Sequence, residues 1–98
     1  METFDDVISA DRLVLVDFFA VWCQPCKMMH LVMEQLKAEL GDRLLIIKVD
    51  VDKHGHTSAR YGIRSVPTFM LFRNGRVLWR QSGAMSKADL PAAVGDYL

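Results

Sequence analysis

The stretch VLVDFFAVWCQPCKMM, residues 14–29, joins two segments with different periodicities. Residues 13–20 are rich in β-branched and aromatic side chains and are apolar on both faces, which predicts a strand covered on two sides. From Cys23 to Leu40 the apolar residues recur at helical spacing, and Gly41 follows as a natural stop. The sequence therefore predicts a central strand that leads directly into a helix, with the chain's two cysteines at the junction.

Three more strands are predicted downstream. Residues 43–52 predict a second strand, and a strand, helix, strand order with short links implies a right-handed parallel unit. Residues 66–72 and 77–82 flank Asn74-Gly75, the strongest short-range signal for a hairpin, so these two strands should be antiparallel. Helices on both faces of the sheet would explain why the first two strands are so apolar.

Three shorter helices complete the predicted elements. Residues 4–12 predict a first helix and residues 56–62 a third one. A final helix should follow Gly83. In that helix either Asp89 is the N-cap, with Pro91 in the first turn, or the helix bends at the proline.

The composition limits the number of domains and the kinds of partner that we expect. Of the 98 residues, 51% are hydrophobic, which is enough for one core and too little for two, so we expect a single domain over residues 1–98. The 12 basic and 12 acidic side chains balance without a basic cluster, so no nucleic-acid partner is expected. The chain shows no secretory signal, and its longest apolar stretch is far shorter than the roughly 20 residues that cross a bilayer. We expect no membrane span and a cytoplasmic location.

The two cysteines are placed for redox chemistry. Two cysteines in an intracellular chain are too few for a disulfide framework. At the N-terminus of a helix, unpaired N–H groups and the helix dipole stabilise a thiolate at Cys23. Pro25 is tolerated in the first turn and stiffens it, which holds Cys26 close enough to attack a mixed disulfide at Cys23. On a helical wheel Cys26 leans toward the apolar stripe, so Cys23 is predicted to be the outer thiol.

Asp17 and Trp22 are the next candidates. A carboxylate in an apolar central strand is costly to ionise, so the pKa of Asp17 should be raised and the group could accept the proton of Cys26. The alternative is a hydrogen-bonded carboxylate without a chemical role. Trp22 could belong to the core, but its position directly before the helix favours a contact role.

Two other classes of function stay open at this point. His54 and His56 could join Cys23 and Cys26 in a zinc module, although their H-x-H spacing departs from the usual pattern. A redox-inactive binding module is the second, and the intact cysteine pair argues against it.

Four motifs carry a resemblance to the thioredoxin family. VLVDFFAVWCQPCKMM, KVDVD, YGIRSVPTFMLFRNG and the glycine of QSGAMSK resemble that family in their order and separations, from about Leu13 to the end of the chain. The resemblance implies an α/β, three-layer sandwich with helices on both faces of a central mixed sheet. About four strands are expected, because the residues before the first predicted strand hardly leave room for the family's first strand. Residues 44–49 would then form an exposed edge, which predicts a monomer or a weak dimer.

The resemblance also implies roles for individual residues. Cys23 would be the attacking cysteine and Cys26 the resolving one, assisted by Asp17 as the buried acid. Lys48 would lie near Asp17, although a solvated edge lysine explains it equally well. Gln24 stands where the family usually has glycine, which leaves the reduction potential open. The implied substrate-binding residues are Trp22, Gln24, Pro25, Ile63, Val66, Gly83 and Pro67, the last as a cis-proline facing the cysteines.

The resemblance therefore implies a thiol-disulfide oxidoreductase that reduces disulfides in client proteins by dithiol exchange. No bound cofactor is expected. Electrons would come from a flavin-dependent thioredoxin reductase that uses NADPH. The alternative within redox chemistry is a disulfide oxidase or isomerase of the same fold.

Overall fold

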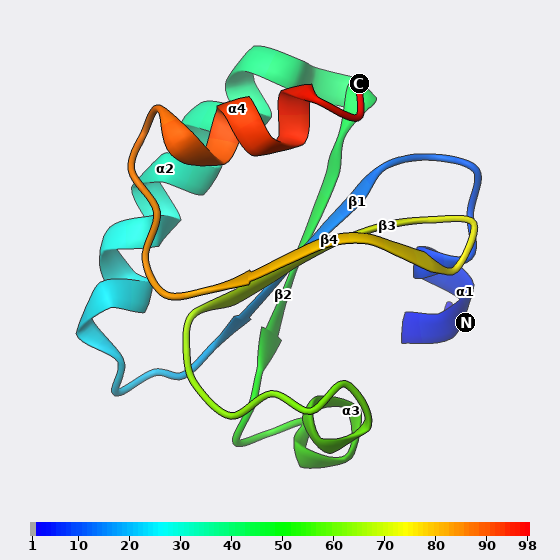
Figure 1. Cartoon of the computed structure of the whole chain (residues 1–98). Helices are drawn as coiled ribbons and strands as arrows, with labels where there is room; N and C mark the ends of the chain where they lie inside the picture. The colour runs from blue at the N-terminus through cyan, green and yellow to red at the C-terminus, as the bar shows by residue number, and fades with distance from the viewer. Residues whose placement is uncertain (1) are drawn as a thin grey trace.

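A four-stranded mixed sheet forms the middle layer of the structure, a computed structural model that describes residues 2–98 (Figure 1). Met1 of the predicted domain lies outside the described residues. The strand order is β2-β1-β3-β4, with β1 parallel to β2 and antiparallel to β3, and with β3 antiparallel to β4. The strands are β1 (Val14–Phe19), β2 (Leu45–Asp50), β3 (Thr68–Arg73) and β4 (Arg76–Ser82).

Helices cover both faces of this sheet, as predicted. Figure 1 shows α2 (Gln24–Leu40) and α4 (Asp89–Gly95) on one side, and α1 (Phe4–Ile8) and α3 (Gly55–Arg60) on the other. A short 3-10 turn, Gly41–Arg43, connects α2 to β2. Two separate hydrophobic clusters result, one between the sheet and α2 with α4, the other between the sheet and α1 with the region of α3.

The alternation along β1 explains why this strand is central. Leu13 and Leu15 belong to the cluster under α2, whereas Val14, Val16 and Phe18 belong to the opposite cluster. Successive side chains of a strand point to opposite faces, so a strand covered on two sides must be apolar throughout. The same alternation places Asp17, the one charged residue of β1, on the α2 face.

Helix α2 confirms the predicted junction. Cys23 is its N-cap and Gly41, with a φ of 52°, is its C-cap. Its buried residues include Met29, Met33 and Leu36, which form the inner stripe that the helical spacing predicts. The helix is therefore capped by a cysteine only a few residues after the central strand.

The hairpin between β3 and β4 is also confirmed. Asn74 has a φ of 53° and Gly75 a φ of 76°. Positive φ at both central residues is the requirement of the tight turn that matches the twist of antiparallel strands. The hairpin backbone also contacts the N-terminal segment, since the N–H groups of Asn74 and Gly75 donate to the carbonyls of Ala10 and Ile8.

These contacts explain why α1 ends earlier than predicted. The helix was expected over residues 4–12 but ends at Ile8, because the carbonyls of Ile8 and Ala10 accept hydrogen bonds from the hairpin instead of continuing the helix. In α4, Pro91 is the third helical residue, so the first of the two alternatives is correct to within one residue. The N-cap is Ala88 rather than Asp89.

Strand β2 forms one edge of the sheet, as the sequence predicts for residues 44–49. Self-association through this edge stays a prediction. Within residues 2–98, no helix has the length and apolar character needed to cross a membrane.

Candidate active site

The two cysteines form a disulfide at the N-terminus of α2. Cys23 is the N-cap, and its Sγ accepts a hydrogen bond of 3.2 Å from the backbone N–H of Cys26. Pro25 lies in the first helical turn, where its missing N–H leaves no intrahelical bond unmade. A sulfur therefore occupies the position where helices usually place a Ser, Thr or Asp oxygen.

The two cysteines of the disulfide differ little in exposure. Cys26 is fully buried and Cys23 is 4% exposed, so Cys23 is the outer cysteine, as predicted, by a small margin. The reason is the N-cap geometry, which turns the sulfur of Cys23 inward to meet the N–H of Cys26. The neighbours Gln24 and Pro25 point to solvent instead.

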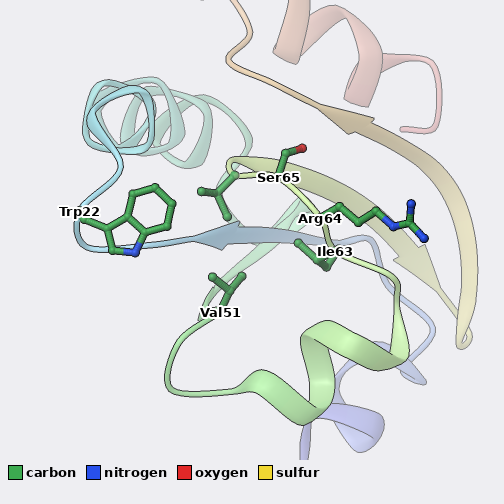
Figure 2. Close-up of a pocket in the computed structure, with 6 residues that line it drawn as sticks. Trp22, Val51, Ile63, Arg64 and Ser65 are labelled. Atoms are coloured by element: carbon green, nitrogen blue, oxygen red, sulfur yellow. The ribbon is translucent and has the colours of Figure 1, made fainter.

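Trp22 lies on the surface beside the disulfide. Its side chain is 68% exposed, and its Nε1–H donates to Oδ2 of Asp52 at 2.9 Å. The ring borders a shallow hollow of about 130 Å³, and Figure 2 shows Trp22 and Ile63 on opposite sides of it. A large apolar ring held at the surface by one hydrogen bond is not part of the core, and its contact role stays a prediction. The partner Asp52 was not predicted.

The segment before β3 forms the opposite wall of the hollow. Ile63, Arg64, Ser65 and Val66 line it, and Val66 also packs against the cluster that contains both cysteines. The peptide bond between Val66 and Pro67 is cis, as the resemblance implies. The structure therefore brings this segment against the disulfide.

Gly83 completes the same surface. Its φ is 95°, a conformation that L side chains rarely adopt, and its N–H donates to the carbonyl of Pro67 at 2.8 Å. The predicted substrate-binding residues from the three segments around positions 22–25, 63–67 and 83 therefore lie around one end of the sheet.

Arg80 on β4 holds the lining segment in place, and no sequence motif identified it. Its guanidinium donates to the carbonyl of Tyr61 and, at 3.0 Å, to that of Gly62. These carbonyls follow the end of α3, where backbone acceptors have no helical partner. Thr68 Oγ1 donates to Ser65 O at 2.8 Å from the other end of the segment.

Asp17 is fully buried on β1. Neither of its carboxylate oxygens has a hydrogen-bond partner among residues 2–98. Burial raises the pKa of Asp17 from its ordinary 3.8 to about 6, and the charge of Lys48 partly opposes that rise. The raised pKa agrees with the prediction. Among residues 2–98 no protein group bonds the carboxylate, and the chemical role of Asp17 stays a prediction.

Lys48 lies opposite Asp17 in the register of β1 and β2. Its Nζ, however, is 2.8 Å from Nδ1 of His30 on α2. Lys48 is thus near the buried acid, as the resemblance implies, but its ammonium is bonded to His30, which no sequence motif identified.

The residues of the zinc alternative do not converge. Cys23 and Cys26 are bonded to each other, while His54 precedes α3 and His56 lies within it. In the part of the chain that the structure describes, no group of three or more His, Cys, Asp or Glu side chains is placed to hold a metal ion.

We expect Asp17→Asn to stabilise the oxidised protein at neutral pH. A carboxyl whose folded pKa is raised contributes a penalty that is absent below its unfolded pKa and is complete above its folded one. At about 1.4 kcal/mol per pKa unit, ionising Asp17 costs the folded state roughly 3 kcal/mol. The free energy of unfolding of the variant relative to the natural chain should therefore rise between about pH 4 and pH 6 and then level off.

Urea unfolding at pH 4, 5, 6 and 7 measures this difference. The value at pH 4 is the internal reference, because it contains the packing effect of the amide and only a small part of the ionisation penalty. A difference between the two proteins that does not change with pH would contradict the raised pKa.

Comparisons with known proteins agree with this geometry. The family model for thioredoxin matches residues 1–96. The thioredoxin of Acidithiobacillus ferridurans is 41% identical over 93 residues, which cover 95% of this chain and 86% of the relative. The thioredoxin of Bacillus subtilis strain 168 is 40% identical over 90 residues, which cover 92% of this chain and 86% of the relative.

The solved structure of a mutant thioredoxin from Halobacterium salinarum NRC-1 superposes with a TM-score of 0.86 at 35% identity. The match covers 95% of this chain and 80% of that one. With the Cys23–Cys26 pair at the helix N-terminus, these matches identify the chain as a thiol-disulfide oxidoreductase, and it belongs to the thioredoxin family.

Proposed function

We propose that this protein reduces disulfides in client proteins by dithiol exchange and that Cys23 is the attacking residue. The observation that carries the proposal is the position of the Cys23 sulfur as N-cap of α2, next to an apolar hollow. N–H groups and the dipole at a helix N-terminus favour the thiolate, which is the nucleophile. In the reduced protein the same position would lower the pKa of the Cys23 thiol.

Client proteins would dock on the surface around the disulfide. Ile63 and Val66 line the hollow opposite Trp22, and an extended client segment would lie along the backbone of Val66 and Pro67. Gly83 leaves the approach to Pro67 free of a side chain. The exposed side chains of Gln24 and Pro25 would form the border next to the sulfur, and we assign them to substrate contact.

The exchange then proceeds in two displacements. The Cys23 thiolate attacks one sulfur of the client disulfide, so that a mixed disulfide forms and the second client sulfur leaves as a thiolate. The Cys26 thiol loses its proton, and its thiolate attacks Sγ of Cys23. The Cys23–Cys26 disulfide forms, the first client sulfur leaves, and the client has gained two electrons.

Asp17 is the proton acceptor that we propose for Cys26. A carboxyl with a pKa of about 6 is mostly ionised at pH 7 and is still basic enough to accept a proton. An ordinary surface carboxylate, with a pKa near 4, would be a much weaker base. Lys48 would adjust this basicity, since its charge lowers the pKa of Asp17.

The oxidised protein must be reduced again after each turnover. We propose a flavin-dependent thioredoxin reductase that uses NADPH as the electron donor, because the chemistry requires a two-electron donor and the chain belongs to the thioredoxin family. We place the reaction in the cytoplasm, where thiols are kept reduced. In this proposal residues 1–98 act as one domain.

Removing the resolving cysteine should trap clients. In Cys26→Ser the second displacement cannot occur, so mixed disulfides should accumulate at Cys23 when the reduced variant is incubated with a disulfide-containing protein. Non-reducing electrophoresis and peptide mass spectrometry measure the adducts. The matched control, Cys23→Ser, keeps one thiol in the buried position and should form roughly tenfold fewer adducts. Equal trapping by the two variants, or none by either, would refute the assignment of Cys23 as the attacking residue.

Asp17→Asn should slow the second displacement without slowing the first. Loss of a general base reduces a rate by roughly a hundredfold, and the difference should shrink below pH 6, where Asp17 is already protonated in the natural chain. Stopped-flow measurement of thiol release from a mixed disulfide preformed at Cys23 follows this step across pH. Asp42→Asn, an equal change of charge at an exposed position, is the control. If Asp17→Asn resolved the mixed disulfide at the natural rate across pH, Asp17 would not be the base.

A further inference from the structure

His30 makes a contact that the exchange mechanism leaves unexplained. It lies four residues after Cys26 on α2, about one turn further along the helix. Its ring is partly buried and packs edge-on against Phe19, with centroids 5.7 Å apart and an interplanar angle of 76°. Nδ1 of the same ring is 2.8 Å from Nζ of Lys48. The ring of His30 therefore contacts an aromatic side chain of β1 and the ammonium of β2 at the same time.

The chemistry of Lys48 and His30 determines which of the two donates the hydrogen bond. A lysine ammonium has three donors and no acceptor, so Nδ1 of His30 must accept. The imidazole is therefore neutral and carries its proton on Nε2. Burial and the charge of Lys48 lower the pKa of His30, which favours this neutral form at pH 7.

Lys48 also faces the buried acid. Asp17 and Lys48 are register partners on adjacent parallel strands, so their side chains lie on the same face of the sheet. Asp17 has no hydrogen-bond partner among the described residues, and the charge of Lys48 acts on it only at a distance. The position of the Lys48 ammonium therefore determines how far its charge lowers the pKa of Asp17.

We propose that His30 is a positioning residue that holds the Lys48 ammonium beside the buried Asp17 carboxyl. Without the imidazole acceptor, the long and exposed side chain of Lys48 would extend into water. Its attraction for the Asp17 carboxylate would then be screened by solvent. His30 thus acts on the exchange reaction through Lys48 and Asp17, without contact with the client.

The other charged groups near the ring leave the neutral imidazole favoured at pH 7. Glu34, one turn further on α2, raises the pKa of His30, but burial and Lys48 act in the opposite direction. Asp50, on the same face of β2 as Lys48, uses Oδ1 to accept from the N–H groups of Asp52 and Lys53. On β1, Asp17 is the charged group of this face.

The contact is also sensitive to acid. A protonated imidazole has two N–H donors and no acceptor, so it cannot bind an ammonium and repels it. Protonation of His30 would release Lys48. The ammonium would then no longer be held beside the Asp17 carboxyl, and the positive charge nearest to it on α2 would be that of the imidazolium.

The test is a titration of the Asp17 carboxyl by carbon-detected NMR in the oxidised protein. This measurement needs no turnover, so its outcome is independent of the proposed function, on which only the kinetic meaning of His30 rests. His30→Ala should raise the pKa of Asp17 by roughly half a pKa unit, because the opposite charge is no longer held nearby. His30→Gln, which retains an acceptor, should restore much of the natural value. Leu31→Ala, the next residue on the helix and 64% exposed, is the matched control and should leave the pKa unchanged.

Lys48→Met separates positioning from a direct effect of the histidine. In the Lys48→Met background, His30→Ala should cause no further rise. The nitrogen chemical shifts of the His30 ring should show the Nε2–H tautomer at pH 7. The proposal would be overturned by an unchanged or lowered Asp17 pKa in His30→Ala, by an equal effect of His30→Ala with and without Lys48, or by the Nδ1–H tautomer. Thermal unfolding of each variant confirms that the titrated species is folded.

Discussion

The site depends on a sulfur that caps α2. The backbone N–H of Cys26 donates to Sγ of Cys23, so one unpaired donor of the first helical turn is satisfied by the sulfur that we propose as the nucleophile. This placement follows from the order of the elements, since the central strand ends only a few residues before the helix begins. An N-cap sulfur lies next to the unpaired N–H groups and the positive end of the helix dipole, whereas Cys26 is the third helical residue and is fully buried, which disfavours its thiolate.

In the mechanism that we propose, the second displacement depends on a different constraint, a carboxyl inside an apolar layer. Asp17 has no hydrogen-bond partner among residues 2–98, so its ionised form is costly and its protonated form is readily reached near neutral pH. The nearest charge on the adjacent strand, Lys48, is bonded to His30 instead of to the carboxyl. Helix α2 therefore carries both the cysteine pair and His30, the residue that contacts Lys48. One helix thus connects the two cysteines with the surroundings of Asp17.

The sequence predicts those features that local patterns determine. The periodicity of residues 13–40 is sufficient to place β1, α2 and the cysteine pair, and Asn74-Gly75 is sufficient to place the hairpin. Features that depend on packing between elements could not be predicted. His30 meets Lys48 across 18 positions and Arg80 meets Tyr61 across 19, and neither pair forms a motif. A helical wheel correctly predicts Cys23 as the outer cysteine, but it does not predict how little of Cys23 is exposed, because an N-cap residue has extended rather than helical backbone.

The central claim is that the two thiols of the reduced protein are unequal because of their positions at the start of α2. The most direct measurement is the pH dependence of alkylation by iodoacetamide at each cysteine, quantified separately by peptide mass spectrometry. The account predicts that Cys23 reacts with a pKa below the roughly 8.5 of a free cysteine and that Cys26 reacts far more slowly at neutral pH. Equal rates at the two positions, with ordinary thiol pKa values, would contradict it.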